Sequence, residues 1–486
     1  MYQISAGENV NVSVREIYRG LQKAQTHLVQ STEIATAGVC QHLFKLSYPF
    51  GVVRGERDYL VANAVHDIMS IAIHGPILEN WVHKPKEHVV ELTRNIVRDS
   101  SSITEQVTKD TKEYAIKEAR TLPESFDHDV EDRFQGLVTG ITKYLMRKYE
   151  QPKSVLTEVT ITNILNHHEG RIDAILEFEN GGYGILDWKT YNINRANGSG
   201  HERWQLLSNM LLSNFRYTNN EDDWSKFLFA SIVYYEGAYM PRLPISEKHI
   251  TKIKNDRFFA HQVLCGNYVR AEKPRFCPVC DTNAEGCSDC RFYREDAKMA
   301  FGGQLPDNYR KITGQLFGNR YKVLQERAET HRHKHVVYTM SSSLGEEAAI
   351  RELERCGILH SGYKFVSSNG TMVRFRNVHE DTFLEPKKVL RVIGKEDNIP
   401  LLSCISEQAT VMEANDYDLV LSFRSQAIVE RAKLQLFKLP LIMLRDEINL
   451  TRRMLEPLHK FHRLAADFLV PRDSCCTNAN GLEDMK

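Results

Sequence analysis

The sequence predicts an α/β core with a mixed sheet, followed by a small β-barrel and a helical C-terminal segment. The first half of the chain alternates helical stretches with apolar β-runs, which is typical of an α/β domain. Two of those runs flank Asn180-Gly181-Gly182, a strong hairpin signal because these residues tolerate positive φ. From about residue 360 onward, short apolar runs alternate closely with turn residues, as in a small barrel.

Length and composition set the outer limits. A chain of 486 residues is long enough for two or three domains. Lys and Arg together number 63, as do Asp and Glu, so binding to nucleic acid would need a local basic patch. The sequence contains no apolar run of about 20 residues and no signal peptide, so we expect a soluble, cytoplasmic protein with no membrane partner.

The N-terminal part is expected to be largely helical. Residues 1–39 are polar, and residues 85–150 are charged with an apolar stripe typical of a core-facing helix. Residues 58–74 predict a helix whose apolar residues lie on one side, and His66 lies within it. Taken alone, a histidine on such a helix is more often structural than a metal ligand.

The predicted hairpin carries charged groups into an apolar sheet. Ser154–Asn163 predicts a strand beside it, and Glu158 on that strand is expected to face solvent. Asp173 lies on the first hairpin strand, and Asp187 and Lys189 lie on the second. Because side chains alternate between the faces of a strand, Asp187 and Lys189 share one face, and strand pairing can bring Asp173 beside them.

Charged groups buried in a sheet are costly unless they have partners. Two close carboxylates suit a hard divalent cation such as Mg²⁺ or Mn²⁺. A nearby lysine can orient or activate a water, or stabilise negative charge that develops on a phosphate. The alternative interpretation is a surface hairpin with an ordinary ion pair.

The elements after the hairpin complete the predicted core. Glu202–Phe215 predicts a helix with Gln205 in its first turn, and Lys226–Tyr239 contains a further strand. The order is therefore helix, strand, hairpin, helix and strand, which indicates an α/β fold.

Cysteines cluster after this core. Four of the ten cysteines are spaced as Cys-x2-Cys-x6-Cys-x2-Cys. In a cytosolic protein this spacing indicates a metal site rather than disulfide bonds. Four thiolates at such spacings suit tetrahedral Zn²⁺ or an iron–sulfur cluster. Cys40, taken alone, is expected to be a buried small hydrophobe. The clustered residues are Cys277, Cys280, Cys287 and Cys290.

The sequence predicts five segments. The core and its cysteine cluster occupy residues 1–302, and the following linker is basic and helical, with its charges expected to face solvent. No Gly-x4-Gly-Lys-Ser/Thr loop is present, so the sequence gives no sign of an ATPase. The segments after the core are the linker at 303–354, the barrel at 355–428, a helical segment at 429–470 and a disordered tail at 471–486.

His66 in a helix, Gly170-x-x-Asp173, Asp187-x-Lys189 and Gln205 in the next helix resemble, in order and separation, the RecB-like branch of the PD-(D/E)xK nucleases. The resemblance implies a restriction-endonuclease-like core. It also implies that His66, Asp173 and Asp187 hold Mg²⁺ or Mn²⁺. Asp173, Asp187, Lys189 and Gln205 would be catalytic, with the lysine acting on the attacking water and the glutamine supporting the site. The family often has Tyr four residues after the glutamine, where this chain has Asn209.

One subgroup of this family carries a 4Fe-4S cluster bound by one cysteine before the core and three after it. Cys40, in a Cys-x3-Phe-x-Leu setting, is similar to the first ligand, and Cys277, Cys280 and either Cys287 or Cys290 match the others. The spacing is slightly wider than usual. The extra cysteine also permits a self-contained Zn²⁺ knuckle that leaves Cys40 idle.

The C-terminal part is similar to the barrel and stalk of flap-trimming nuclease-helicases, without their motor. The resemblances imply a divalent-metal-dependent DNA nuclease acting on single strands, flaps or ends in replication or repair. Two alternatives stay open. One is a catalytically silent DNA-binding subunit of a separate helicase, and the other is a CRISPR spacer-acquisition nuclease, which the extra barrel disfavours. The intact Asp173, Asp187 and Lys189 favour an enzyme.

Overall fold

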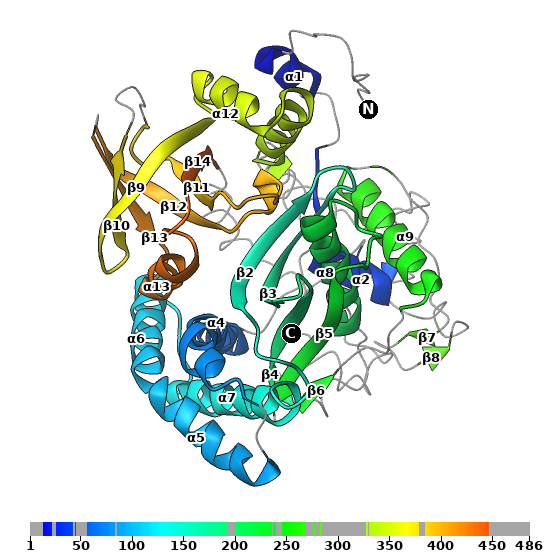
Figure 1. The fold of residues 1–486 in the computed structure, drawn as a ribbon, viewed down its shortest axis with the longest axis vertical. Coiled ribbons are helices and arrows are strands. Elements are labelled where there is room, and N and C mark those ends of the chain that lie inside the picture. Colours follow the sequence, from blue (N-terminus) through cyan, green and yellow to red (C-terminus); the bar gives the residue numbers. More distant parts are fainter. Residues whose placement is uncertain are drawn as a thin grey trace, which may run out of the picture. The chain divides into compact units, whose positions relative to one another are not determined.

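The computed structural model describes two compact units (Figure 1). We call them the sheet unit, from Val29–Val159 and Gly170–Tyr321, and the barrel unit, from Met1–Leu28, Thr160–Glu169 and Lys322–Arg453. In the described chain, residues before 29 and from 327 to 446 belong to the barrel unit, whereas the sequence predicted boundaries at 302 and 354. The described residues are 13–21, 26–41, 44, 56–82, 85–192, 201–235, 237–239, 245–265, 267, 276–277, 282–283, 327–328, 330–378, 384–415 and 417–446.

A mixed sheet forms the centre of the sheet unit, as predicted. Its order is β1-β3-β4-β5-β6, with β2 also paired to β3. β3 and β4 are antiparallel, β4 and β5 are parallel, and β5 and β6 are antiparallel. The strands are β1 (Val29–Gln30), β2 (Ser154–Asn163), β3 (His168–Glu177), β4 (Tyr183–Asn192), β5 (Phe227–Tyr235) and β6 (Gly237–Tyr239).

The predicted hairpin is β3–β4, and its turn has the expected chemistry. Gly181 adopts φ +77°, which glycine reaches without a steric penalty. The Gly182 N–H donates to the Asn180 side-chain oxygen at 2.8 Å. The register places Ile175 opposite Ile185 and Ala174 opposite Leu186. Asp173 and Asp187 each lie one residue beyond the Ala174–Leu186 pair.

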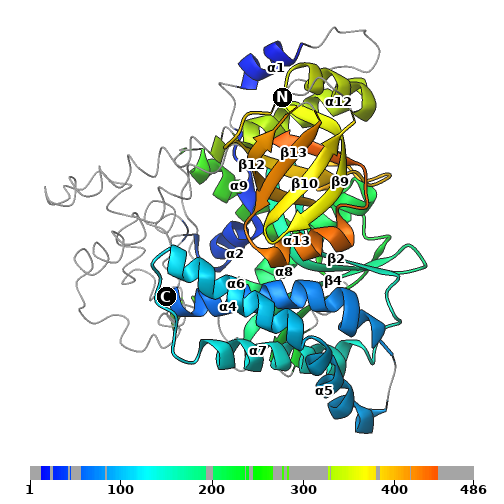
Figure 2. The same cartoon turned by 90° about the vertical axis from the view of Figure 1, so that its left-hand side faces the viewer.

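Helices cover both faces of the sheet. α7 packs on β4 and β5, and α4 packs on α6 and α7 (Figure 2). α8 packs on β4 and β5 and contacts α2. The helices are α2 (Ser31–Val39), α4 (Glu56–Ala72), α5 (Val89–Asp99), α6 (Ser101–Lys117), α7 (Phe126–Gly140), α8 (His201–Thr218) and α9 (Glu247–Leu264), with π-helical turns at Ile73–Ile77 and Ile141–Leu145.

The alternation of β4 assigns its residues to these two layers. Tyr183 donates to Asn214 of α8, and Lys189 donates to Gln205 of α8. Trp188, between them in the alternation, instead donates to His66 of α4. The odd-numbered residues of β4 therefore face α8, and Trp188 faces α4.

The barrel unit contains a closed six-stranded antiparallel barrel (Figures 1 and 2). Val373 and Phe375 of β10 are buried, whereas Arg374 and Arg376 between and after them are exposed, as the predicted period of two requires. Around the barrel the order is β10-β13-β12-β11-β14-β9. The strands are β9 (Leu359–Asn369), β10 (Met372–Asn377), β11 (Val389–Gly394), β12 (Ser406–Ala414), β13 (Asp418–Phe423) and β14 (Leu441–Arg445).

The segment predicted as helical from 429 onward is only partly so. α13 (Gln426–Gln435) is a helix, but Leu441–Arg445 forms β14, which pairs with β11 and β9 and closes the barrel. A short apolar run fits a helix or a buried strand equally well, and here closure of the barrel leaves no strand edge unpaired. The predicted stalk beyond 446 and the predicted tail lie outside the described residues.

The described part of the predicted basic linker is partly buried, whereas its charges were expected to face solvent. Residues 330–344 are helical, and with α12 (Glu346–Arg355) they bury Val336, Met340 and Leu353 in an apolar cluster of the barrel unit. Lys334 is buried and forms an ion pair with Glu169. The described part of this segment is therefore part of a core and not a solvated helix. None of the helices described has the length and hydropathy needed to cross a membrane.

Gly170 tests how tightly β3 packs. A Cβ there would lie 2.3 Å from Ser31 Oγ of α2 and 2.6 Å from Leu212 Cδ1 of α8. We expect Gly170→Ala to lower the free energy of unfolding by about 1–3 kcal/mol through overpacking. Gly75→Ala is the control, because nothing lies within 4 Å of its Cβ position. Chemical denaturation of both variants measures the effect, and equal stability would contradict this packing.

Candidate metal centre

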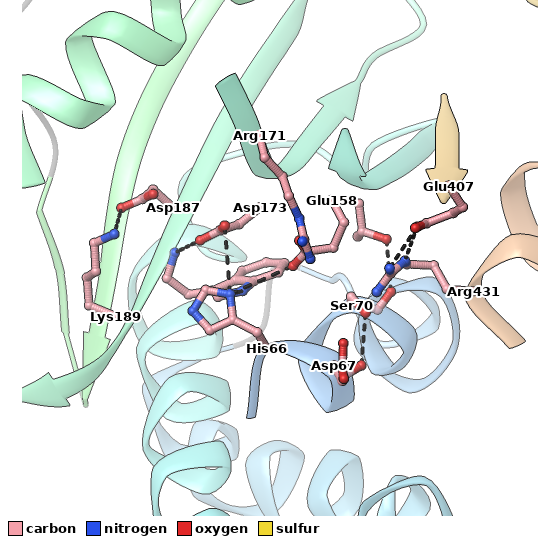
Figure 3. A network of polar contacts seen from close by, with 12 residues as sticks. His66, Asp67, Ser70, Glu158, Arg171, Asp173, Asp187, Lys189, Glu407 and Arg431 are labelled. Atoms are coloured by element: carbon pink, nitrogen blue, oxygen red, sulfur yellow. Dashed lines mark hydrogen bonds and ion pairs between the residues drawn. The ribbon is translucent and has the colours of Figure 1, made fainter. Parts of the chain in front are cut away.

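Three side chains from three elements of the sheet unit converge on one point. They are His66 of α4, Glu158 of β2 and Asp173 of β3, and their ligand atoms all lie within 4.8 Å of one another. His66 Nδ1 lies 3.7 Å from Glu158 Oε1 and 3.7 Å from Asp173 Oδ1 (Figure 3). Among the residues that the structure describes, this is the group of three found in an arrangement fit for a metal ion.

Burial makes this arrangement costly without a cation. The side chains of Glu158 and Asp173 are 2% and 11% exposed, and that of His66 is 28% exposed. Ionised carboxylates removed from water need a counter-charge. One imidazole and two carboxylate oxygens suit a divalent ion such as Mg²⁺, Mn²⁺ or Zn²⁺, so the donor set fits a metal without selecting one.

The prediction that Glu158 faces solvent is wrong. Glu158 is 4% exposed and adopts φ +57°, in the left-handed region that non-glycine residues rarely occupy. A left-handed residue interrupts the alternation of a strand and redirects its side chain. Strain of this kind persists only where surrounding structure enforces it, and it is concentrated at functional sites.

The charges of the three groups perturb one another. Burial raises the pKa of Asp173 to about 7, against the lowering effect of His66, and the Asp187 and Glu158 charges raise it further. Burial alone would lower the pKa of His66, but Asp173 and Glu158 outweigh it and the net direction is upward. Both shifts arise because negative charge is concentrated in a site with little water.

Trp188 holds two of the three groups in place. Its backbone N–H donates to Asp173 Oδ2 at 2.9 Å, and its indole N–H donates to His66 Nδ1 at 3.2 Å. The second bond stabilises the neutral tautomer with a lone pair on Nδ1, the form that a metal ligand needs. Ligation through Nδ1 would replace this hydrogen bond, so it requires a small rotation of His66 or Trp188.

Arg171 contacts the outer side of the same group. Its guanidinium forms an ion pair with Glu158 Oε2, whereas Glu158 Oε1 is the oxygen that faces His66. The Arg171 side chain is 54% exposed, so it extends from the buried carboxylate toward solvent.

Asp187, Lys189 and Gln205 form a second polar group beside the first. Lys189 Nζ lies 2.7 Å from Asp187 Oδ2 and donates to Gln205 Oε1 at 3.2 Å. Burial alone would lower the pKa of Lys189, but Asp187 and Asp173 outweigh it, so the net shift is upward. Lys189 is therefore an ammonium ion at neutral pH, which donates hydrogen bonds and cannot accept a proton.

The structure thus brings all five residues of the predicted catalytic and metal site into one region, in two groups. His66 and Asp173 share the triad with Glu158, while Asp187 pairs with Lys189 and interacts with Asp173 only through its charge. Ligation of a metal by Asp187 stays a prediction.

Sequence reasoning missed three residues here: Glu158, Arg171 and Trp188. A lone acidic residue in the otherwise apolar and hydroxyl-bearing strand Ser154–Asn163 was a usable signal for Glu158. Arg171 and Trp188 stand inside the Gly-x-x-Asp and Asp-x-Lys patterns at their variable positions, so the patterns gave no reason to select them.

The structure describes only two of the predicted cysteine ligands, Cys40 and Cys277. Cys40 is buried at the end of α2, and Cys277 lies on the short strand β7 (Phe276–Cys277), which pairs with β8 (Thr282–Asn283). Cys280, Cys287 and Cys290 lie outside the described residues.

Comparison with known proteins adds no family assignment. The chain matches no protein-family model, and a search of curated proteins finds no match either.

The raised pKa of Asp173 predicts a pH dependence of stability in the chelated protein. An acid with a folded pKa of about 7 and an ordinary value of 3.8 makes the folded state lose stability as pH rises between those values. We expect Asp173→Asn to raise the free energy of unfolding by about 1 kcal/mol near pH 8 in EDTA, with no gain near pH 4.

Thermal unfolding across this pH range measures the difference between variant and wild type. Asp99→Asn, on an exposed helix surface, is the control for a lost carboxylate. A gain that is the same near pH 4 and near pH 8 would contradict the assignment of the shift to Asp173.

Proposed function

We propose that this protein is a divalent-metal-dependent nuclease that hydrolyses phosphodiester bonds of DNA. The observation that carries the proposal is the buried triad of His66, Glu158 and Asp173 with the Lys189 ammonium beside it. A metal-ligand set next to a positive side chain suits a reaction in which negative charge develops on a phosphate.

The triad would hold Mg²⁺ or Mn²⁺, because carboxylate oxygens are the ligands that these ions prefer. When bound, such an ion supplies Lewis-acid stabilisation of the phosphate and lowers the pKa of the attacking water. Trp188 orients the Asp173 ligand through its backbone N–H, and its indole N–H holds His66 in place until a metal takes Nδ1. Oriented ligands keep the site in its productive geometry.

Lys189 supplies the second positive charge. Its upward pKa shift keeps it protonated, so it donates to the phosphate or orients the water, while a different group must accept the proton. Asp187 and Gln205 hold its Nζ from two sides at 2.7 Å and 3.2 Å, which fixes the direction of the ammonium group. We therefore assign Gln205 a positioning role.

The substrate and partners follow from the resemblance of the motifs. We propose single strands, flaps or ends of DNA as substrates, in replication or repair, and a separate helicase as partner because the chain has no phosphate-binding loop. A net charge of zero means that contacts with DNA depend on local cations such as Lys189 and Arg171.

The assay is hydrolysis of a labelled single-stranded oligonucleotide with Mn²⁺. We expect Asp173→Ala, Asp187→Ala and Lys189→Ala each to lower the rate by about 100-fold or more, because each removes a charge that acts on the reacting phosphate. Lys153→Ala is the matched control, since Lys153 is an exposed lysine of the same unit that pairs with Glu179 at the other end of the hairpin.

Two results would contradict this function. Equal activity in wild type and in the three variants would remove the site. DNA binding that persists with no cleavage under any divalent metal would favour a catalytically silent DNA-binding subunit.

The cysteine cluster remains a prediction of a 4Fe-4S cluster, with Zn²⁺ as the alternative. Protein purified without oxygen should absorb near about 400 nm if iron–sulfur is present. Cys40→Ala should reduce this band if Cys40 is a ligand. A colourless protein that contains about one equivalent of zinc would establish the knuckle instead.

A further inference from the structure

Glu158 is a carboxylate with two different neighbours. Its Oε1 belongs to the triad and lies 3.7 Å from His66 Nδ1, while its Oε2 is paired with the guanidinium of Arg171. The side chain of Glu158 is 2% exposed and that of Arg171 is 54% exposed. A carboxylate that bridges two cations is the usual feature of nuclease sites with two metal ions, in which both ions hold the same phosphate.

Each of the other two carboxylates has one oxygen already engaged by the protein. Asp173 Oδ2 accepts the backbone N–H of Trp188 at 2.9 Å, so only its Oδ1 faces the triad. Asp187 Oδ2 is paired with Lys189 Nζ at 2.7 Å. A second divalent ion bound through Asp187 Oδ1, which has no hydrogen-bond partner among the described residues, would lie beside the Lys189 ammonium, whose positive charge opposes it.

The charge balance leads to the same result. Asp173, Asp187 and Glu158 carry three negative charges when ionised for metal ligation, and Arg171 and Lys189 carry two positive charges. One negative charge remains. A single divalent ion changes the net charge of the site to one positive charge, which matches the single negative charge of a phosphodiester. Two divalent ions would give the site three positive charges, more than one phosphodiester can neutralise.

We propose that Arg171 takes the place of a second metal ion at this centre. One divalent ion bound by His66, Glu158 and Asp173 and the guanidinium of Arg171 share the Glu158 carboxylate and together hold one phosphate of the substrate. The fork of a guanidinium donates two parallel N–H groups to phosphate oxygens, which a lysine cannot do. This inference rests on the proposed nuclease function, and it specifies the number of metal ions and the group that binds the phosphate.

The experiment has two readouts on the full-length protein, neither of which is catalysis. Calorimetric titration with Mn²⁺ gives the number of ions, and fluorescence anisotropy gives the affinity for a phosphorothioate oligothymidylate that resists hydrolysis. We expect about one Mn²⁺ per chain at the triad, abolished by Asp173→Asn. Arg171→Met should bind the oligonucleotide about 10- to 100-fold more weakly in Mn²⁺, and Arg171→Lys should recover only part of the loss.

The affinity of Arg171→Met for Mn²⁺ separates this role from a structural one. Removing a neighbouring cation should leave the affinity for Mn²⁺ equal to that of wild type or higher, whereas loss of a group that merely positions Glu158 should lower it. Arg98→Met is the matched control, because Arg98 is 75% exposed and pairs only weakly with Asp99 at 3.5 Å. It should change neither readout.

Three outcomes would overturn the inference. They are two Mn²⁺ ions at the centre in wild type, oligonucleotide binding by Arg171→Met as tight as that of wild type, and a lowered Mn²⁺ affinity in that variant. If wild type binds Mn²⁺ at the triad and cleaves DNA, these outcomes leave the nuclease function standing. If wild type binds no Mn²⁺ that Asp173→Asn removes, the nuclease function and the inference both fail.

Discussion

The burial of three carboxylates in one small region is the constraint on which the rest of the sheet unit depends. Glu158, Asp173 and Asp187 are all buried, and burial, together with the charges of Asp187 and Glu158, raises the pKa of Asp173. Such a cluster is tolerated only with cations beside it. The neighbouring elements contribute to that end, since β3 positions Arg171, β4 positions Trp188 and Lys189, and α8 positions Gln205.

Arg171, Trp188 and Lys189 contact different members of the buried acidic group or its histidine. Lys189 neutralises Asp187, and the Trp188 amide and indole fix Asp173 and His66. Arg171 covers the outer oxygen of Glu158. One set of ligand atoms facing inward is then left for a divalent ion, and the positive groups around it can meet a phosphate. A site built for binding alone would gain nothing from holding like charges so close together, and this favours the proposed nuclease function over a silent binding subunit.

The sequence predicted much of this from local patterns. Asn180-Gly181-Gly182 identified the hairpin, and strand alternation put Asp187 and Lys189 on one face, where Lys189 pairs with Asp187 and donates to Gln205 of α8. The burial of Glu158 was missed because its left-handed backbone conformation, at φ +57°, is not visible in the local sequence pattern. Leu441–Arg445 escaped because its status as a strand is decided by β9 and β11, far away in the sequence. The local pattern thus located Asp173 and Asp187, whereas it could not indicate an irregular backbone or pairing between distant strands.

The measurement that bears most directly on the metal centre is anomalous diffraction from crystals grown with Mn²⁺. The account predicts a single strong peak within about 2.0–2.3 Å of one atom each of His66, Glu158 and Asp173. A peak that contacts only surface carboxylates, or none within ligand distance of Glu158 and Asp173 at saturating Mn²⁺, would contradict it.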